Sequence, residues 1–379
     1  MPDPPSDPER LESRHLIALN CDLDLSREAV CLLGAGAEPW WRDEARATKA
    51  EARRLGVRRG ELAIARSTLG WAAELAERER ERARRCDATI VTRLDASYPA
   101  IFRELALPPP VLYVRGSWPR RPCLSIVGAR HATAYGREVA ELFAAYLAGC
   151  GLAVVSGFAR GIDTAAHRAA ARAAEGVTVA VMGCGLDVDY PRGRRGLRDE
   201  ICRRGALVSE FPCGAEPLPR NFPIRNRLIA ALGHGTLVVE ATARSGSLIT
   251  ARLALELGRD VYAVPGRIWD DKSIGPNSLI RDGAFLVQHP REILESLPLA
   301  VRDRLPAAGE PAAPPAPALP PEQQGVLDRL PPGEPLGVDE LARAAGLPVD
   351  RLSCLLLELE LAGRVRRHPG PAYSRGSRG

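Results

Sequence analysis

Short apolar runs alternate with longer segments of mixed polarity between Cys123 and Leu297. The intervening segments, such as 137–148, 164–174 and 197–204, have the length of helices. Continuous apolar strands separated by helices predict an α/β fold with a doubly wound parallel sheet that is covered on both faces. The predicted strands are Leu124–Gly128, Leu152–Gly157, Val177–Gly183, Ala206–Glu210, Thr236–Glu240, Val261–Val264 and Phe285–Gln288.

Two other patterns precede this predicted sheet. From residue 11 to 85, apolar residues recur at helical spacing, and Glu77–Ala83 alternates in charge as a solvated helix does. We therefore predict an N-terminal helical domain at 1–85, in which no chemistry is indicated. Thr89–Thr92 and Val111–Val114 have strand character and are expected to lead into the main sheet.

The composition changes after Leu297, so we predict that the core domain spans residues 86–300. Seven prolines among alanines at Pro306–Pro321 predict an extended linker at 301–321. A small C-terminal domain is then expected at 322–379. Its expected elements are helices at Gln323–Leu330, Val338–Ala345 and Val349–Leu361, and a hairpin around Arg364–Gly370.

The overall charge narrows the function only slightly. A net charge of +5 is compatible with a polyanionic partner but does not require one. Lysine occurs only at Lys49 and Lys272, so nearly all of the 52 basic residues are arginines, a bias that genome composition alone can produce.

The cysteines and the termini predict a cytoplasmic protein. The nine cysteines include no C-x-x-C pair and have the pattern of buried thiols in a reducing compartment. The proline-rich start has no signal-peptide core. The uncharged run Leu142–Ala159 is interrupted by Gly149 and Gly151, so we expect no membrane span.

The strongest chemical signal follows the predicted strand Thr236–Glu240. Ser245, Gly246, Ser247 and Thr250 stand where that strand turns into a helix, and such a turn offers backbone N–H groups and hydroxyls to an anion. Just upstream, Phe222-Pro-Ile-Arg-Asn-Arg227 supplies an aromatic ring, an amide and two guanidinium groups, which suit a phosphate with a base attached.

Other strand ends carry similar residues. Because ligands of doubly wound sheets bind at the carboxyl ends of the strands, these positions are candidates for one positively charged edge. The candidates outside the Ser245 turn are Arg130, Ser156, Gly157, Arg160, Arg192, Phe222, Arg225, Asn226 and Arg227. The Arg-Asn-Arg group also fits a structural salt-bridge network with Asp or Glu, and the sequence leaves that alternative open.

Signatures of catalysis are absent from the sequence. The G-x-G-x-x-G, Walker A, G-x-S-x-G and H-E-x-x-H patterns are missing, and the acidic residues form no metal-type cluster. His167 lies in an alanine-rich helical segment and is expected to be a structural residue rather than a base. We expect no catalytic residue, cofactor or metal.

Eight motifs follow one another in the order found in the DNA processing protein A (DprA, or Smf) family, which the region 90–297 therefore resembles. They are Val127–Arg130, Ser156–His167, Gly185–Pro191, Ser209–Pro212, Phe222–Ile229, Ser245–Ala251, Val264–Gly266 and Leu279–Ala284. The resemblance implies an extended Rossmann-like core that dimerises, binds single-stranded DNA and loads the RecA recombinase during natural transformation. Single-strand-binding protein is a further candidate partner. Residues 1–85 lack the glycine-rich helix-hairpin signature of the family's N-terminal domain and resemble a degenerate form of it.

In this family the positive pocket includes the residues that match Arg130, Arg192, Phe222, Arg225, Asn226, Arg227, Ser245, Gly246, Ser247 and Thr250. Arginines and helix-terminal N–H groups take phosphates, and Phe222 stacks a base. On this basis, replacing Arg225 or Arg227 with alanine is expected to weaken single-strand binding by on the order of 1–3 kcal/mol and to leave the fold intact.

The C-terminal region resembles the winged-helix domain of many DprA proteins. Its third predicted helix places Asp350, Glu358 and Glu360 among the exposed positions, whereas basic residues gather in the wing and tail. Since acidic side chains repel phosphates, we expect a protein-contacting or weak backbone-binding role rather than sequence readout. The basic residues concerned are Arg364, Arg366, Arg367, Arg375 and Arg378.

Two other functional classes remain open at this point. A Rossmann-type nucleotide hydrolase similar to the lysine-decarboxylase-like phosphoribohydrolases also has a small-residue turn after a late strand, but its P-G-G-x-G-T motif is replaced here by Arg244-Ser-Gly-Ser. Release of free base from a nucleoside monophosphate would identify it. A transcription regulator that works through the C-terminal domain would instead give a footprint at a defined DNA sequence.

Overall fold

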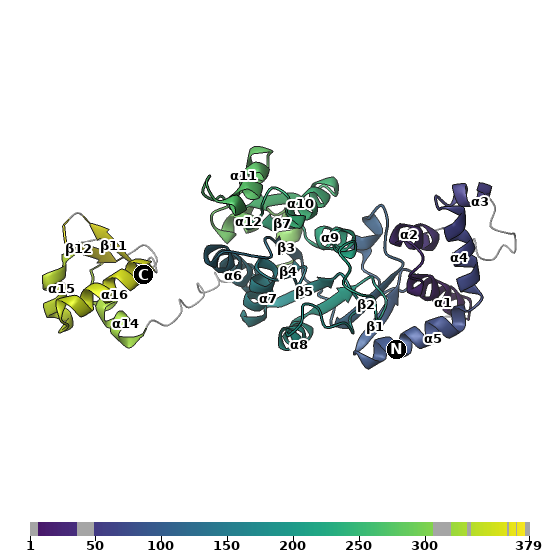
Figure 1. Ribbon diagram of the computed structural model, residues 1–379, viewed down its shortest axis with the longest axis horizontal. Coiled ribbons are helices and arrows are strands. Elements are labelled where there is room, and N and C mark those ends of the chain that lie inside the picture. The colour runs from purple at the N-terminus through teal and green to yellow at the C-terminus, as the bar shows by residue number, and fades with distance from the viewer. Residues whose placement is uncertain are drawn as a thin grey trace. The chain divides into compact units, whose positions relative to one another are not determined.

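The computed structural model divides into two compact units, Met1–Pro314 and Pro315–Gly379, which are described separately (Figure 1). It describes residues 7–35, 49–305, 320–331, 335–361, 364–368 and 370–375. Most of the predicted linker, 306–319, lies outside these ranges, as does Arg378.

A nine-stranded sheet forms the centre of the first unit, in the order β1-β2-β6-β5-β4-β3-β7-β8-β9. The strands from β6 to β9 in this order are mutually parallel, whereas β1 and β2 join antiparallel at one edge. This arrangement confirms the predicted doubly wound α/β fold and its two-strand lead-in. The strands are β1 Ala88–Thr92, β2 Val111–Gly116, β3 Cys123–Val127, β4 Ala153–Ser156, β5 Val177–Met182, β6 Ala206–Ser209, β7 Gly235–Val238, β8 Asp260–Ala263 and β9 Phe285–Leu286.

Helices bury both faces of this sheet, which is why its strands are continuously apolar. In β4, Ala153 and Val155 face a core with α9 and α10, whereas Val154 faces a core with α6 and α7 on the opposite side. The helices that follow the strands are α6 Ala134–Gly149, α7 Ile162–Arg172, α8 Arg195–Arg204, α9 Asn221–Leu232, α10 Gly246–Glu256, α11 Ile274–Arg281, α12 Pro290–Ser296 and α13 Leu299–Arg302.

The order of the strands reverses between β3 and β7. From β3 the chain winds outward through β4 and β5 to β6, and α9 then carries it back so that β7 pairs with β3 on its other side. A crevice at the carboxyl ends of the strands is expected where the winding direction changes, and this is where doubly wound sheets bind ligands. The turns after β3, β4, β5 and β7 therefore border one region.

The described residues before β1 form five helices, which lie on the β1–β2 side of the sheet and belong to the same unit (Figure 1). Asn20 donates to the Glu210 carbonyl at 3.2 Å, and Glu79 accepts from the Cys213 amide at 2.7 Å, so polar contacts attach these helices to the loop after β6. The helices are α1 Asp7–Cys21, α2 Arg27–Ala35, α3 Lys49–Arg54, α4 Arg59–Leu69 and α5 Ala72–Arg85.

The second unit has its own core and the arrangement of a winged helix. Leucines from its three helices, among them Leu341, Leu355 and Leu359, meet in one cluster beneath a three-stranded sheet of order β10-β12-β11. Its elements are α14 Pro321–Asp328, β10 Leu336–Gly337, α15 Val338–Ala345, α16 Val349–Leu361, β11 Val365–His368 and β12 Ala372–Arg375. The predicted helices and hairpin are all present.

Across the described ranges, no helix combines the length and apolarity needed to cross a membrane. The run Leu142–Ala159 instead provides the second half of α6, the turn at Gly151 and strand β4.

Candidate nucleic-acid interface

An aromatic platform formed by Tyr190 and Phe222 stands at the carboxyl edge of the sheet. Phe222 lies in the first turn of α9, and its ring is 5.6 Å from that of Tyr190 at an interplanar angle of 40°. Gly183 follows β5 beneath the Phe222 ring, where an added Cβ would approach the ring to 2.9 Å. Both residues are half-buried, so each keeps part of its surface exposed.

Arg130 flanks this platform from the turn after β3. Its guanidinium carbon lies 5.1 Å from the centre of the Phe222 ring, within the range of a cation–π interaction. Arg130 and Arg192, which follows Tyr190 in the chain, are both exposed. The structure thus brings Arg130 and Phe222, two of the predicted site residues, into contact.

Arg225, in contrast, lies inside the protein with only 4% of its surface exposed. Its Nη1 donates to the carbonyl oxygens of Gly157, at 2.7 Å, and Val181. Burial lowers the pKa of Arg225 to about 10, although the nearby Asp163 carboxylate opposes that shift. The guanidinium therefore ties α9 to the ends of β4 and β5.

Asp163 supplies the negative charge of this buried group. Its carboxylate accepts from the amides of Gly157, at 3.1 Å, and Ala159, at 3.2 Å. Burial raises the pKa of Asp163, and Arg225 is the strongest influence in the other direction. Because a protein carboxylate takes the amides at this strand-to-helix turn, the position where many doubly wound folds bind a nucleotide phosphate is occupied from within.

Gly157 is needed where these two charged side chains meet. A Cβ at this position would lie 2.7 Å from Arg225 Nη2 and 2.8 Å from Asp163 Oδ2, closer than real Cβ contacts. Glycine at this position therefore leaves the space that the buried Arg225 and Asp163 side chains occupy.

The Ser245 turn begins α10 as predicted. The Ser245 hydroxyl accepts from the Ser247 amide at 3.4 Å and lies 2.7 Å from the Ser247 hydroxyl, while Gly246 is exposed at the first position of the helix. Asn226 donates to the Gly246 carbonyl at 3.2 Å and accepts from Arg225 Nε at 3.3 Å. Asn226 thereby connects this turn to the buried arginine and the platform.

Arg227 faces away from this group. It forms a buried ion pair with Glu210 at 2.5 Å and donates to the Leu107 carbonyl at 2.6 Å. The structural salt bridge considered as an alternative is therefore present for Arg227. Both guanidinium groups bond to buried protein groups. From these contacts we expect that removing either one destabilises the fold, in contrast to the expectation from the sequence that the fold stays intact.

The remaining predicted residues divide into buried and exposed positions. Ser156 is fully buried and donates to the Ile126 carbonyl at 2.6 Å, and Thr250 is 1% exposed. Arg160 is exposed in the turn before α7. Ser156 and Thr250 thus contribute to packing, whereas Arg160 is available to a ligand.

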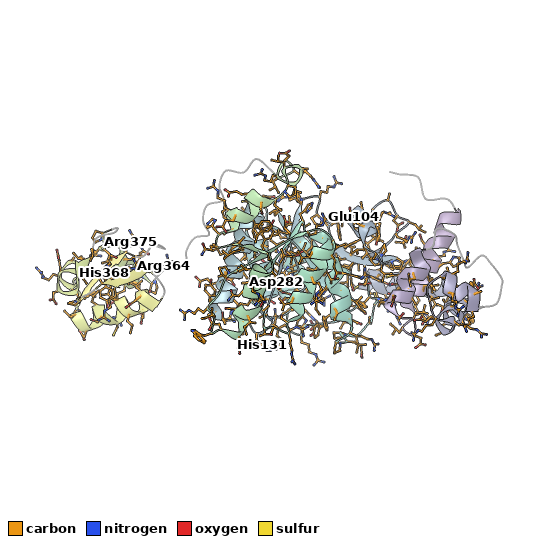
Figure 2. All side chains as sticks on the ribbon, turned by 90° about the horizontal axis from the view of Figure 1, so that it is seen from above. Glu104, His131, Asp282, Arg364, His368 and Arg375 are labelled. Atoms are coloured by element: carbon orange, nitrogen blue, oxygen red, sulfur yellow. The ribbon has the colours of Figure 1, made fainter. Side chains whose placement is uncertain are left out.

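A cationic pocket beside Arg130 was not predicted. It has a volume of about 540 Å³ between the turn after β3, α6 and α7. The sequence feature that could have predicted this pocket is the presence of basic residues in the first two turns of helices that follow neighbouring strands. Its lining residues are Arg130, His131, Ala132, Arg137, Glu141, Gly161, Thr164, Ala165, Arg168, Arg194 and Lys272; His131 is labelled in Figure 2.

His167 lies in the core, which is compatible with the structural role expected for it. It is fully buried, its Nδ1 lies 2.7 Å from the Thr178 hydroxyl, and burial lowers its pKa to about 3. Among the described residues, no group of three or more His, Cys, Asp or Glu side chains is arranged to hold a metal ion.

The winged-helix unit exposes little positive charge on α16. Val349, Asp350 and Leu357 are exposed on that helix, and its Arg351 pairs with Glu322 at 2.6 Å. Arg366 and Arg367 are exposed on β11, and Arg375 lies 3.6 Å from Asp328. Figure 2 shows Arg364, His368 and Arg375 on the strand side of this unit.

Two family models match the chain. Residues 89–298 match DNA recombination-mediator protein A, and residues 310–371 match the DprA winged helix domain. Protein Smf of Escherichia coli K12 is 45% identical over 254 residues, which are 65% of this chain and 66% of that protein. Protein Smf of Synechocystis sp. PCC 6803 is 35% identical over 314 residues, or 74% of this chain and 78% of that protein.

Two solved structures of DNA processing protein A are similar to this fold. The Streptococcus pneumoniae protein superposes with a TM-score of 0.66 at 33% identity, covering 76% of this chain and 98% of that one. The Helicobacter pylori protein, described for its single-stranded DNA binding mode, has a TM-score of 0.50 at 28% identity and covers 56% of this chain and 97% of that one.

Proposed function

This chain belongs to the DNA processing protein A family, and from that membership we propose that it binds single-stranded DNA at the carboxyl edge of its sheet without catalysing a reaction. The observation that carries the proposal is the half-buried aromatic platform of Tyr190 and Phe222 beside the exposed Arg130. A base stacks on the ring while the guanidinium neutralises a neighbouring phosphate.

We propose two roles for the predicted site residues, according to their burial. Residues with exposed or half-buried surface contact the strand directly, whereas buried residues hold the turns that present them. The direct contacts are Arg130, Arg160, Arg192, Phe222, Ser245 and Gly246. The supporting residues are the buried Ser156, Gly157, Arg225, Asn226, Ser247 and Thr250, together with the half-buried Arg227, whose guanidinium is paired with Glu210.

A single strand suits this edge better than a duplex. A ring that is half-buried at the end of a helix reaches a base only when the base is unstacked from its neighbours, which a single strand permits at low cost. Stacking and phosphate contacts are tolerant of sequence, so the binding we propose has little base preference.

The wider role that we propose follows from the family. The protein protects incoming single strands in the cytoplasm and loads the RecA recombinase onto them in natural transformation and recombination, with single-strand-binding protein as a further partner. We also propose a homodimer through the core. Exposed apolar residues late in the core support it, namely Ile249, Leu255, Ile274, Phe285 and Leu286.

Substitutions at the platform test the proposed DNA site. We expect Phe222→Ala to weaken binding of an oligo(dT) strand by about 1–3 kcal/mol, whereas Phe222→Trp, which keeps a stacking surface, retains most of the affinity. Arg130→Ala is expected to weaken binding and to reduce its salt dependence, because one phosphate contact is lost.

Arg172→Ala is the matched control for the arginine variant. Arg172 is exposed in the last turn of α7 and does not line the site, so its removal changes the net charge equally. Fluorescence anisotropy titrations measure the affinity of all four variants for the oligo(dT) strand. Unchanged affinity of both Phe222→Ala and Arg130→Ala would refute this placement of the site.

A further inference from the structure

The cationic pocket beside the platform concentrates basic side chains at one point. Arg130 and His131 come from the turn after β3, Arg137 from the start of α6 and Arg168 from α7. Arg194 precedes α8, and Lys272, one of the two lysines in the chain, lies in the 3-10 helix η3 Asp271–Ser273. Five cations from separate segments therefore converge, and Glu141 is the one acidic residue that lines the pocket.

These cations lack acidic partners. In the part of the chain that the structure describes, Arg130, Arg137, Arg168, Arg194 and Lys272 form no ion pair. The exposed arginines of α5 differ, since Arg78, Arg84 and Arg85 each pair with a glutamate of the same helix. Positive charge in the pocket is thus left for a ligand to neutralise.

Repulsion among the cations is visible in one of them. Burial lowers the pKa of Arg194, and the nearby Arg168 and Arg160 lower it further, whereas the Asp163 carboxylate acts in the opposite direction. Arg194 is nevertheless held in place, because it donates to the Thr164 hydroxyl, and Arg137 is held by donating to the Ala132 carbonyl at 2.7 Å. Side chains that are fixed against their mutual repulsion are preorganised for an anion.

The ligand that matches this arrangement carries more than one charge on a single group. A phosphodiester strand spreads single charges along a line, whereas a terminal phosphomonoester carries nearly two charges on one phosphorus. The small residues Ala132, Gly161 and Ala165 also line the pocket, where α6 and α7 pack against each other. A strand is not expected to continue between those two packed helices.

We propose that this pocket binds the terminal phosphate, together with its nucleotide, of a DNA strand whose following bases lie on the Tyr190–Phe222 platform. The inference rests on the proposed function, since it adds recognition of strand ends to single-strand binding. The pocket volume of about 540 Å³ accommodates a nucleotide as well as its phosphate. Arg130 borders both the pocket and Phe222, so it connects the two parts of the path.

The test compares strands that differ only at their ends. Oligo(dT) of one length, with an internal fluorophore, carries a 5′-phosphate, a 3′-phosphate or hydroxyl groups at both ends. For the wild-type protein, we expect one phosphorylated end to bind about tenfold more tightly than hydroxyl ends, the equivalent of one charge-assisted contact. The double variant Arg168→Ala/Arg194→Ala is expected to reduce this preference to about twofold or less.

Arg172→Ala serves as the matched control, because Arg172 lies one helical turn from Arg168 on α7 and does not line the pocket. It is expected to keep the full preference. Thermal unfolding of each variant reports whether it is folded, and Arg168→Lys, which keeps the charge, is expected to retain most of the preference.

Three results would overturn the inference. The first is that the wild-type protein binds phosphorylated and hydroxyl-ended strands with equal affinity. The second is that the preference for the phosphorylated end survives the double substitution in a folded protein. The third is that free thymidine 5′-monophosphate displaces the labelled phosphorylated strand at the same concentration as the unlabelled strand does. The last result would assign the pocket to a free nucleotide. Hydroxyl-ended strands test single-strand binding separately from recognition of the terminal phosphate, because they carry no terminal phosphate for the pocket. If they bind but show no difference from phosphorylated strands, only the further inference fails.

Discussion

Arg130 and Arg225 both approach the Phe222 ring, but their surroundings give them different roles. The Arg225 guanidinium is buried and bonds to strand-end carbonyls, whereas Arg130 is exposed. A sequence motif gives the identity of a side chain but not its burial. Arginines that support a site and arginines that contact a ligand therefore look alike in the sequence.

The first prediction concerns the buried arginine. We expect Arg225→Ala to lower the free energy of unfolding by about 2–4 kcal/mol, because it leaves the Gly157 and Val181 carbonyls without their donor and Asp163 without its nearby cation. Arg192→Ala, at an exposed position, is expected to change stability by less than about 0.5 kcal/mol. Urea unfolding measures both, and equal stability of the two variants would contradict the structural role.

A second prediction at the scale of a residue concerns His167. Its pKa is about 3 in the folded protein and near 6.5 in the unfolded chain, so only the unfolded chain takes up a proton between these values. Its contribution to stability is therefore complete above about pH 6.5 and is lost as the pH falls toward 3, by about 1.4 kcal/mol per pH unit.

His167→Gln removes this titration while keeping a side chain able to bond Thr178. As the pH falls from about 6 to about 4.5, the unfolding free energy of this variant should fall less steeply than that of the wild type. The two slopes of free energy against pH should differ by about 1.4 kcal/mol per pH unit, which corresponds to one proton. Parallel curves from urea unfolding across this range would show that His167 does not carry the effect.

At the scale of elements, the sequence predicted most of the fold, because strands buried on both faces are continuously apolar. The predicted strand Thr236–Glu240 corresponds to β7, Gly235–Val238, and the helix predicted after Ser245 corresponds to α10. The sequence was less informative where packing sets the limits. The predicted strand Phe285–Gln288 is only Phe285–Leu286 in the structure, where it forms the edge of the sheet and pairs on one side alone.

The winged-helix unit provides a prediction at this scale. α16 exposes Val349 and Leu357 beside Asp350, so it is suited to a protein partner rather than to a DNA groove. We expect the triple substitution of Arg364, Arg366 and Arg367 by alanine to weaken binding of single-stranded DNA by less than Phe222→Ala does. Anisotropy titrations compare the two proteins. A loss as large as that of Phe222→Ala would assign the wing to DNA binding.

At the scale of the whole molecule, the cationic pocket could not be predicted from any one segment. Arg130, Arg168, Arg194 and Lys272 are spread over more than a third of the chain, and only the winding of the sheet brings them to one edge. The platform has the same origin, since Tyr190 follows β5 and Phe222 begins α9. The sequence predicted that the candidate residues follow the carboxyl ends of the strands, but not how they are grouped in space.

The proposed dimer is also a property of the whole molecule. We expect Leu286→Asp to convert a dimer into a monomer, because it places a charge on the exposed edge strand β9, next to the exposed Phe285. Leu299→Asp is the matched control, since Leu299 is an exposed leucine of α13 and not of the edge strand. Light scattering after size exclusion gives the masses. A wild-type monomer, or a Leu286→Asp dimer, would contradict this interface.

The measurement that tests the central claim most directly is the affinity of the wild-type protein for hydroxyl-ended oligo(dT) and for a duplex of equal length, titrated across salt concentrations. We predict that the protein binds the single strand more tightly than the duplex. The logarithm of the binding constant should fall with the logarithm of the salt concentration, with a slope of about −0.7 for each phosphate contacted. Preference for the duplex, or single-strand binding that is independent of salt, would contradict a site built from an aromatic platform and exposed arginines.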